Sequence, residues 1–394
     1  MSFATESGPE NVVTIKVVGV GGAGNNVVNR MVKSGTQGIE YVAVNTDKQA
    51  LAVSSADQKI QIGEKLTHGQ GAGSDPDVGK RSAEESRNNS AKSLENADMV
   101  FITAGMGGGT GTGAAPTIAD IAREAGILTV GVVTKPFKFE GKRRMDQAMV
   151  GINELLGKVD SLLIIPNDRL KFATDQKVTL ANAFEIADDV LIKAVSSISE
   201  LIKNTGFINL DFADVTCVMK NAGFAHMGVG RAAGKGKAED AARMAVASPL
   251  METSINGARG VLINITGSED MGLEDVETAA NLVQEAAHPD ANIIFGASFD
   301  PSLDDEIRVS VIATGFDEPG KAQAEAAPAA AAAPAAAPAA GMYTAAATAA
   351  AAAPAAAPAP AAAPAAPAAA PAADAAAPAE EDPFDSIFKI FNSK

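Results

Sequence analysis

The stretch GMGGGTGTGAAP, at residues 105–116, places six glycines and two threonines in one short segment. The residues before it, DMVFITAG at 98–105, are typical of a buried strand, and TIADIAREAG at 117–126 has helical spacing. So many glycines cost conformational entropy, and a purely structural role does not explain them. Free backbone amides at the start of a helix, with threonine hydroxyls beside them, predict a site for phosphate groups.

A second glycine loop, GVGGAGNN at 19–26, follows a β-branched strand at 11–20 and leads into a helix at 26–35. Two such loops at neighbouring strand ends would hold a polyphosphate from both sides. The loop also matches the dinucleotide fingerprint, with Asp47 placed to hold a ribose, so an NAD-binding Rossmann oxidoreductase is an alternative. A tight strand-to-helix turn is the structural alternative. The Lys-Ser/Thr ending of a P-loop is absent from both loops.

Strand and helix patterns alternate along the first half of the chain, which predicts a Rossmann-like parallel sheet with helices on both faces. A long periodic stretch at 179–206 predicts a central helix that ends at Gly206. The patterns over 211–316 predict a smaller α+β domain with a mixed sheet. The expected strands are 11–20, 39–45, 59–63, 98–105, 126–134, 161–167, 224–232, 260–267, 291–299 and 307–316, and the other expected helices are 77–97, 238–251 and 273–287.

The charge and the cysteine count limit the classes of function. The formal net charge is −16, which argues against nucleic-acid binding because that requires a basic surface. The single cysteine, Cys217, excludes an intrachain disulfide and suits a reducing cytosol. Neither a membrane-spanning run of large apolar residues nor a signal-peptide core is visible. These features predict a cytoplasmic protein whose membrane contact is indirect.

The segment GGGTGTG at 107–113 resembles the signature loop of the tubulin and FtsZ superfamily of GTPases. Together with GVGGAGNN and with NLDFADV at 209–215, it is most similar to the bacterial cell-division branch, and the resemblance extends in order over 11–316. The resemblance implies a polymerisation-activated GTPase that hydrolyses GTP to GDP and phosphate. It also implies head-to-tail filaments of a cytokinetic ring. A non-hydrolysing, GTP-gated scaffold is the other interpretation.

The resemblance and the composition together predict six segments. They are a disordered N-terminus (1–10), a GTP-binding domain (11–178), the central helix (179–206), a C-terminal α+β domain (207–317), a disordered Ala/Pro-rich linker (318–379) and a partner-binding peptide (380–394). Proline recurs every few residues in the linker and breaks the helix that alanine favours. The peptide has an apolar stripe of Phe384, Ile387, Phe388 and Phe391. By resemblance it binds a membrane adaptor and other division proteins, and an idle tail is the alternative.

By resemblance, the phosphates of GTP lie on both glycine loops. The expected contacts are Gly21, Gly22, Ala23, Gly24, Asn25, Asn26, Gly108, Gly109, Thr110 and Gly111. GAGSDP at 71–76 resembles a loop that senses the γ-phosphate, although its residues alone indicate a plain turn. The histidines are scattered and no compact ligand cluster is visible, so we expect no protein metal site and Mg²⁺ that arrives with the nucleotide.

The resemblance also assigns the sugar and the base of the nucleotide. Glu140 would hold the ribose hydroxyls and Arg144 would reach the sugar-phosphate region. Asn167 and Asp188 would read the guanine edge, and Phe184 would stack on the ring. From the residues alone, Glu140 and Arg144 suit an exposed charged helix start, and Phe184 suits a core position.

Two carboxylates in NLDFADV, Asp211 and Asp214, are neighbours at a helix start and share one face. A helix cap formed by Asn209 or Asp211 is the structural alternative. The central helix puts about 35–40 Å between these acids and the glycine loops, so they would reach the phosphate of a stacked neighbour. By resemblance Asp211, Asp214 and Asn209 are catalytic in the next subunit. The main partner is then the chain itself, at the mid-cell division site beneath the inner membrane.

Overall fold

The fold is known from a computed structural model. The described residues are 13–35, 38–172, 178–179, 182–203, 208, 211–249, 255–268, 270–300 and 303–316. They all belong to one compact unit. The predicted N-terminal segment 1–10, the linker 318–379, the peptide 380–394 and Asn209 lie outside the described residues. The predicted division of 11–317 into two domains and a central helix stays a prediction.

The described part of the chain forms a ten-stranded sheet in the order β3-β2-β1-β4-β5-β6-β7-β10-β8-β9. The strands are β1 (Ile15–Val20), β2 (Ile39–Asn45), β3 (Gln58–Gln61), β4 (Met99–Gly105), β5 (Leu128–Lys135), β6 (Ser161–Pro166), β7 (Gly223–Ala233), β8 (Gly260–Gly267), β9 (Asn292–Phe299) and β10 (Glu306–Thr314). The first six strands are parallel, and their order reverses between β1 and β4. Ligands of open parallel sheets bind at such a reversal, outside the carboxyl ends of the strands.

The remaining strands make the sheet mixed. β7 continues the parallel half next to β6 over three residue pairs, from Ser161 opposite Gly223 to Leu163 opposite Ala225. β10 then pairs antiparallel with both β7 and β8, whereas β9 is parallel to β8. A Rossmann-like parallel half followed by a smaller mixed half confirms the predicted fold class.

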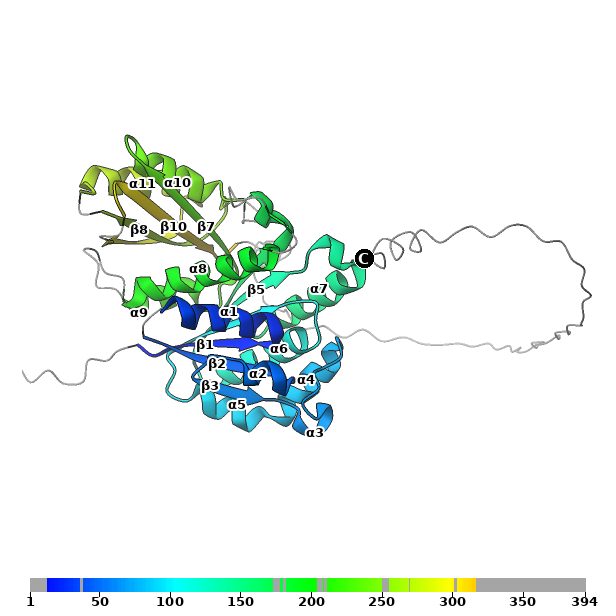
Figure 1. The fold of residues 1–394 in the computed structure, drawn as a ribbon. Helices are drawn as coiled ribbons and strands as arrows, with labels where there is room; N and C mark the ends of the chain where they lie inside the picture. The colour runs from blue at the N-terminus through cyan, green and yellow to red at the C-terminus, as the bar shows by residue number, and fades with distance from the viewer. Residues whose placement is uncertain are drawn as a thin grey trace, which may run out of the picture. The chain divides into compact units, whose positions relative to one another are not determined.

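Helices cover both faces of the parallel half (Figure 1). One face carries α1 (Gly21–Ser34) and α8 (Ala183–Lys203), followed by α9 (Phe212–Met219); the other carries α4 (Pro76–Glu85), α5 (Arg87–Leu94), α6 (Thr110–Glu124) and α7 (Lys142–Leu156). In the mixed half, α10 (Lys237–Val246) and α11 (Leu273–Ala286) pack over a third core. Short helical segments are α2 (Lys48–Ala52), α3 (Glu64–Thr67), η1 (Lys138–Glu140) and η2 (Asn167–Phe172).

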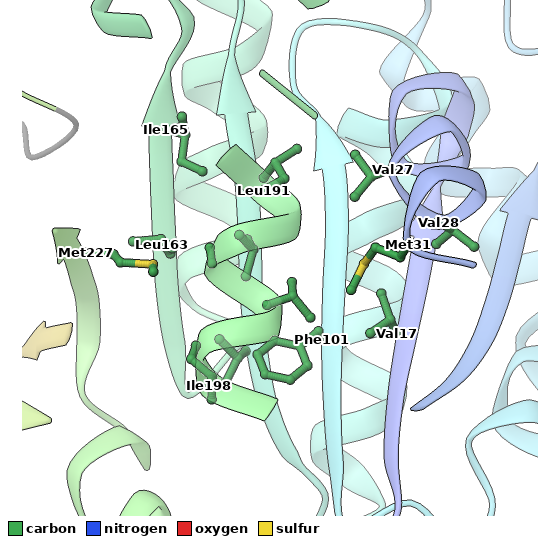
Figure 2. Close-up of a cluster of buried hydrophobic side chains, with 14 of the residues drawn as sticks. Val17, Val27, Val28, Met31, Phe101, Leu163, Ile165, Leu191, Ile198 and Met227 are labelled. Carbon is green, nitrogen blue, oxygen red and sulfur yellow. The ribbon is translucent and has the colours of Figure 1, made fainter. Parts of the chain in front are cut away.

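Helix α8 lies at the centre of the largest core cluster. Figure 2 shows its Leu191 and Ile198 among Phe101 of β4, Leu163 of β6 and Met227 of β7. The same cluster continues into strands β8 and β10 of the mixed half. The apolar face of α8 is therefore buried against both halves of the sheet, which fixes the position of the helix relative to the strand ends.

Several helix boundaries differ from the prediction. The helix expected at 238–251 ends at Val246, and the helix after the second glycine loop begins at Thr110 rather than at residue 117. The helix expected at 77–97 is wrong as one element, because it breaks at Ser86, whose hydroxyl accepts a hydrogen bond from Gly63 N at 3.2 Å. The first helix begins at Gly21 rather than at residue 26, since the glycine loop itself forms the first helical turn. The long helix occupies Ala183–Lys203, and residues 180–181 and 204–207 are not described.

Within the described ranges, no helix combines the length and the apolar character that a membrane crossing requires.

Replacement of Leu191 by alanine should lower the free energy of unfolding by about 2–5 kcal/mol, because it opens a cavity in a buried cluster. The matched control is Lys193→Ala, an exposed position of the same helix, which should change this free energy by about 0.5 kcal/mol or less. Chemical denaturation measures both. Equal unfolding midpoints for the two variants would contradict the central position of α8.

Candidate functional site

The two glycine loops lie side by side at the carboxyl ends of adjacent strands. β1 and β4 pair in parallel with Val20 opposite Ala104, and each strand leads directly into its loop. Gly21 has a φ of +73°, and a Cβ atom there would lie 2.9 Å from Gly111 N. The backbones of the two loops therefore approach as closely as glycine allows, and the N-termini of α1 and α6 open at the same place.

Two of the loop glycines border open space. A Cβ atom built on Gly22 or on Gly108 would have no atom within 4 Å. By contrast, a Cβ on Gly24 would lie 2.4 Å from Thr103 O, and one on Gly113 would lie 1.9 Å from Pro76 O. Packing inside the protein thus requires glycine at 24 and 113 but not at 22 and 108. A ligand that approaches the backbone closely would account for the glycines at 22 and 108.

The other expected phosphate contacts of the first loop differ in exposure. Ala23 and Asn26 are exposed, as is Gly22, whereas Asn25 is buried. With its amide oriented to match the neighbouring donors and acceptors, the Asn25 nitrogen donates to Gly19 O at 2.8 Å and its oxygen accepts from Asn45 Nδ2 at 3.1 Å. The side chain of Asn25 therefore holds the loop in shape and does not face the open side.

The segment 71–76 packs against the second glycine loop. It forms a turn in which Asp75 N donates to Ala72 O at 3.0 Å, and the Asp75 carboxylate caps α4 by accepting from Asp77 N at 3.0 Å. A Cβ atom on Gly109 would lie 2.9 Å from Ala72 Cβ. The turn geometry is thus present, and it also places this segment beside the open space at Gly108.

Glu140 and Arg144 form one ion pair at the edge of the same space. Glu140 Oε2 lies 3.1 Å from Arg144 Nε, and Glu140 Oε1 accepts from Phe137 N at 2.8 Å. Gly107, in the second loop, has a φ of +99°, and a Cβ atom there would meet Arg144 Cγ at 2.7 Å. The structure therefore brings the predicted sugar residues against the second glycine loop.

A buried amide, a carboxylate and a half-exposed ring gather beyond this ion pair. Asn167 follows β6 and is 5 % exposed, and its Oδ1 has no hydrogen-bond partner among the described residues. Asp188 is 9 % exposed, while Phe184, one turn earlier on α8, is 48 % exposed and meets Phe137 edge-on at 5.5 Å between ring centroids. An unpartnered amide oxygen, a carboxylate and an aromatic face are groups that suit a planar base with N–H donors.

Arg30 of α1 is a residue of this region that sequence patterns do not predict. Its Nε lies 3.2 Å from Asp188 Oδ2, and its terminal nitrogens reach Glu185 at 3.1 Å and Asp189 at 3.8 Å. Burial raises the pKa of Asp188 to about 6, and the Arg30 charge opposes that rise. Arg30 thus fixes one carboxylate oxygen of Asp188.

Asp47 does not support the dinucleotide alternative. Its Oδ1 accepts hydrogen bonds from Gln49 N at 2.8 Å and Ala50 N at 3.4 Å, and it thereby caps the N-terminus of α2. One of its two carboxylate oxygens is thus used as a helix cap. Asp47, which together with the glycine fingerprint suggested a dinucleotide, therefore has a local structural task.

Asp211 and Asp214 lie away from the glycine loops. Asp211 Oδ1 accepts from Asp214 N at 2.8 Å and Asp214 Oδ2 accepts from Asp211 N at 3.3 Å, so the two acids cap α9. Helix α8 starts beside the segment that follows β5, where Phe184 meets Phe137. Its 21 residues extend about 30 Å from there towards α9 (Figure 1). Asp211 is exposed, and the chain does not bring it to its own glycine loops.

Among the described side chains, no group of three or more His, Cys, Asp or Glu residues is arranged to hold a metal ion.

Two family models match the chain. The model described as "Tubulin/FtsZ family, GTPase domain" matches residues 14–175. The model described as "FtsZ family, C-terminal domain" matches residues 223–317. The first match contains both glycine loops, and the two matches fall on either side of α8 and α9.

Solved structures with the same fold include two of FtsZ from M. jannaschii. The chain is 46 % identical to the empty FtsZ dimer, with a TM-score of 0.73 and coverage of 77 % of this chain and 88 % of that one. It is also 46 % identical to a tryptophan-to-tyrosine mutant of that FtsZ, with a TM-score of 0.74 and coverage of 77 % and 91 %. CetZ2 from Haloferax volcanii, a GTPγS-bound protofilament, shares the fold at 20 % identity and a TM-score of 0.65, with coverage of 79 % and 96 %.

Alanine at position 22 should separate ligand binding from folding. Because the space beside Gly22 is open, Gly22→Ala should leave the free energy of unfolding unchanged within about 0.5 kcal/mol. The added methyl should nevertheless weaken guanine-nucleotide binding by about tenfold to a hundredfold, through overpacking against the phosphates. Fluorescence titration with a labelled nucleotide measures the affinity.

Gly24→Ala is the matched control, because its methyl would meet Thr103 O inside the protein. This variant should lose about 1–3 kcal/mol of unfolding free energy. The interpretation of Gly22 is wrong if both variants destabilise the fold equally or if Gly22→Ala binds nucleotide as the parent does.

Nucleotide affinity should decline as the pH falls through about 6, because the Asp188 carboxyl, with its pKa raised to about 6 by burial, then becomes protonated. A protonated carboxyl accepts less strongly from the base, and the loss should reach about tenfold. Asp188→Asn should bind weakly at every pH and lack this decline. A titration series between about pH 5 and pH 7.5 compares the two; equal slopes would exclude Asp188 as the titrating group.

Proposed function

The chain belongs to the Tubulin/FtsZ family of GTPases, and from that premise we propose that it assembles into head-to-tail filaments that form the cytokinetic ring of a dividing bacterium. The family membership makes it a GTPase with a guanine-nucleotide site. The assembly, its role at the division site and the residues that act are the proposal. One of the similar structures, at 46 % identity, is a dimer of FtsZ from M. jannaschii, which supports self-association here.

The separation of the two parts of the site is the observation that carries the proposal. The open space at Gly22 and Gly108 lies at the carboxyl ends of β1 and β4, and Asp211 and Asp214 follow α8 at about 30 Å from its start. In this proposal, one chain holds a nucleotide pocket that lacks the two carboxylates of α9, and it holds those two carboxylates away from its own nucleotide. A head-to-tail contact would join them, and because such a contact does not close on itself, it produces a filament.

In the proposed pocket, backbone amides and hydroxyls bind the phosphates. Glu140 accepts from the ribose hydroxyls and Arg144 lies beside the sugar-phosphate region. Asn167 and Asp188 accept from the guanine N–H groups, which adenine does not present together, and Phe184 stacks on the base. The proposed phosphate contacts are Gly21, Gly22, Ala23, Gly24, Asn25, Asn26, Gly108, Gly109, Thr110 and Gly111.

Hydrolysis is a phosphoryl transfer to water, in which the protein mainly orients the reactants. Asp211 and Asp214 of one subunit, together with Asn209, would orient and polarise the attacking water at the γ-phosphate of the next. Their capping hydrogen bonds keep both carboxylates at the start of α9. Mg²⁺ that arrives with the nucleotide would offset phosphate charge. We assign no protein ligands to it.

We place the protein in the cytoplasm, at the mid-cell site beneath the inner membrane. The net charge of −16 argues against nucleic acid as a partner. Segment 380–394, with its stripe of four large apolar residues, would bind a membrane adaptor and other division proteins, so that membrane contact is indirect. The linker 318–379 would separate that peptide from the GTP-binding domain at 11–178 and the α+β domain at 207–317.

Asp214→Ala should bind GTP with unchanged affinity and hydrolyse it at least about a hundredfold more slowly, because the variant keeps the pocket and loses a group that activates water. Asp214→Asn keeps an oxygen for the cap of α9 and should lose turnover to the same extent. Phosphate release and nucleotide titration measure the two effects. Loss of GTP binding would instead place Asp214 in the pocket of its own chain.

Mixing two impaired variants, at a GTP concentration too low for Gly22→Ala to bind, tests whether the acids act in trans. Asp214→Ala supplies a pocket, and Gly22→Ala supplies acids, so the mixture should hydrolyse GTP faster than the sum of its parts. For the parent protein, turnover per subunit should rise with concentration in step with light scattering. Constant turnover down to concentrations without scattering, or an inactive mixture, would reject hydrolysis at a subunit contact. A parent protein without any turnover would favour the GTP-gated scaffold.

A further inference from the structure

The carboxyl end of β2 contacts both glycine loops through two consecutive buried side chains. Asn45 donates from Nδ2 to the Asn25 side chain of the first loop at 3.1 Å. Thr46 Oγ1 lies 2.7 Å from Oγ1 of Thr110, which begins α6 at the second loop. Asn45 is 3 % exposed and Thr46 is 0 % exposed. Neither residue borders the open space, so each acts through its neighbour.

The backbone around Thr46 is held firmly. Its carbonyl oxygen accepts from Gly71 N at 3.3 Å and lies 3.3 Å from Thr67 Oγ1, whose one hydrogen also faces Gly63 O at 3.0 Å. Within the described part of the chain, the contact with Thr110 is the one hydrogen bond of the Thr46 hydroxyl. A fixed backbone and a single partner leave the Thr46 hydroxyl one direction in which to form a hydrogen bond.

We infer that Thr46 is a positioning residue for GTP: its hydroxyl donates to Thr110 Oγ1, which directs the hydroxyl hydrogen of Thr110 to a phosphate oxygen. This inference rests on the proposed function, in which Thr110 contacts the phosphates. It assigns a task to a buried threonine that lies 64 residues from its partner and outside both glycine loops.

The direction of the hydrogen bond follows from the number of hydrogens. A hydroxyl has one hydrogen and two lone pairs. If Thr110 gave its hydrogen to Thr46, it would turn only lone pairs to the phosphate, and the two would repel. A bond from Thr110 to a phosphate is charge-assisted and therefore the stronger choice. Thr46 then becomes the donor, and its bond polarises the Thr110 hydroxyl further.

A double-mutant cycle tests the inference, with GTP affinity measured by fluorescence titration. Thr46→Val removes the hydroxyl at nearly constant shape and should weaken GTP binding by about threefold to tenfold, the range of one hydrogen bond. Thr110→Val should weaken it at least as much, and the double variant should match Thr110→Val alone. Thr46→Ser restores the hydroxyl and should bind nearly as the parent does.

Thr129→Val is the matched control. Thr129 is also 0 % exposed, and its hydroxyl donates to Ile127 O at 2.9 Å, near the amino end of β5. This variant loses a buried hydroxyl away from the loops and should keep the parent affinity.

Unfolding of the nucleotide-free variants gives a second readout. Thr110→Val leaves the Thr46 hydroxyl buried without a partner. The double variant lacks that hydroxyl and should therefore have a larger free energy of unfolding than Thr110→Val alone.

The outcomes separate the inference from the proposed function. Multiplicative losses in the double variant, or a Thr46→Val affinity equal to that of Thr129→Val, would overturn the role of Thr46 while Thr110 keeps its own. An unchanged affinity in Thr110→Val would overturn both that role and the proposed phosphate contact. Equal losses in Thr46→Ser and Thr46→Val would show that the methyl packing, and not the hydroxyl, matters.

Discussion

The site depends on one constraint, the parallel pairing of β1 with β4. This pairing sets two strand ends next to each other and points two helix N-termini into one space. The loops then approach so closely that a side chain at Gly21 would strike Gly111 N. Backbone amides are supplied from both sides, and the loops provide no cationic side chain for the phosphates. The other groups of the proposed pocket come from η1, α7 and η2, which follow β5 and β6, and from the first turns of α8.

Helix α8 links packing to chemistry. Its buried face belongs to the same cluster as residues of β4, β6, β7, β8 and β10, so the helix moves only if both halves of the sheet move with it. Its first turns carry Phe184 and Asp188, and its last residue precedes the segment that leads to the acids. In the proposed pocket, a movement of the guanine base against these two residues would therefore be transmitted along a rigid helix of about 30 Å.

Local patterns predicted the elements and the glycine loops, because strand burial, helix periodicity and glycine density are properties of neighbours in the chain. The strands at 39–45 and 260–267 match β2 and β8 in full. The break at Ser86, the ion pair between Arg30 and Asp188 and the contact of Thr46 with Thr110 could not be predicted. Each joins residues more than twenty positions apart, and no local spacing signals such a contact. The catalytic roles remain predictions that rest on the family resemblance.

The proposed division of the site between the two ends of α8 has a consequence for the number of working sites in a filament. In a stack of n such subunits, the number of junctions is n − 1, so one terminal molecule always keeps a nucleotide that no neighbour attacks. Short oligomers would then hydrolyse GTP most slowly per molecule. Conversion of GTP to GDP would begin in the interior of a filament. The end with an unmatched pocket and the end with unmatched acids would also differ chemically, which gives the polymer a built-in polarity.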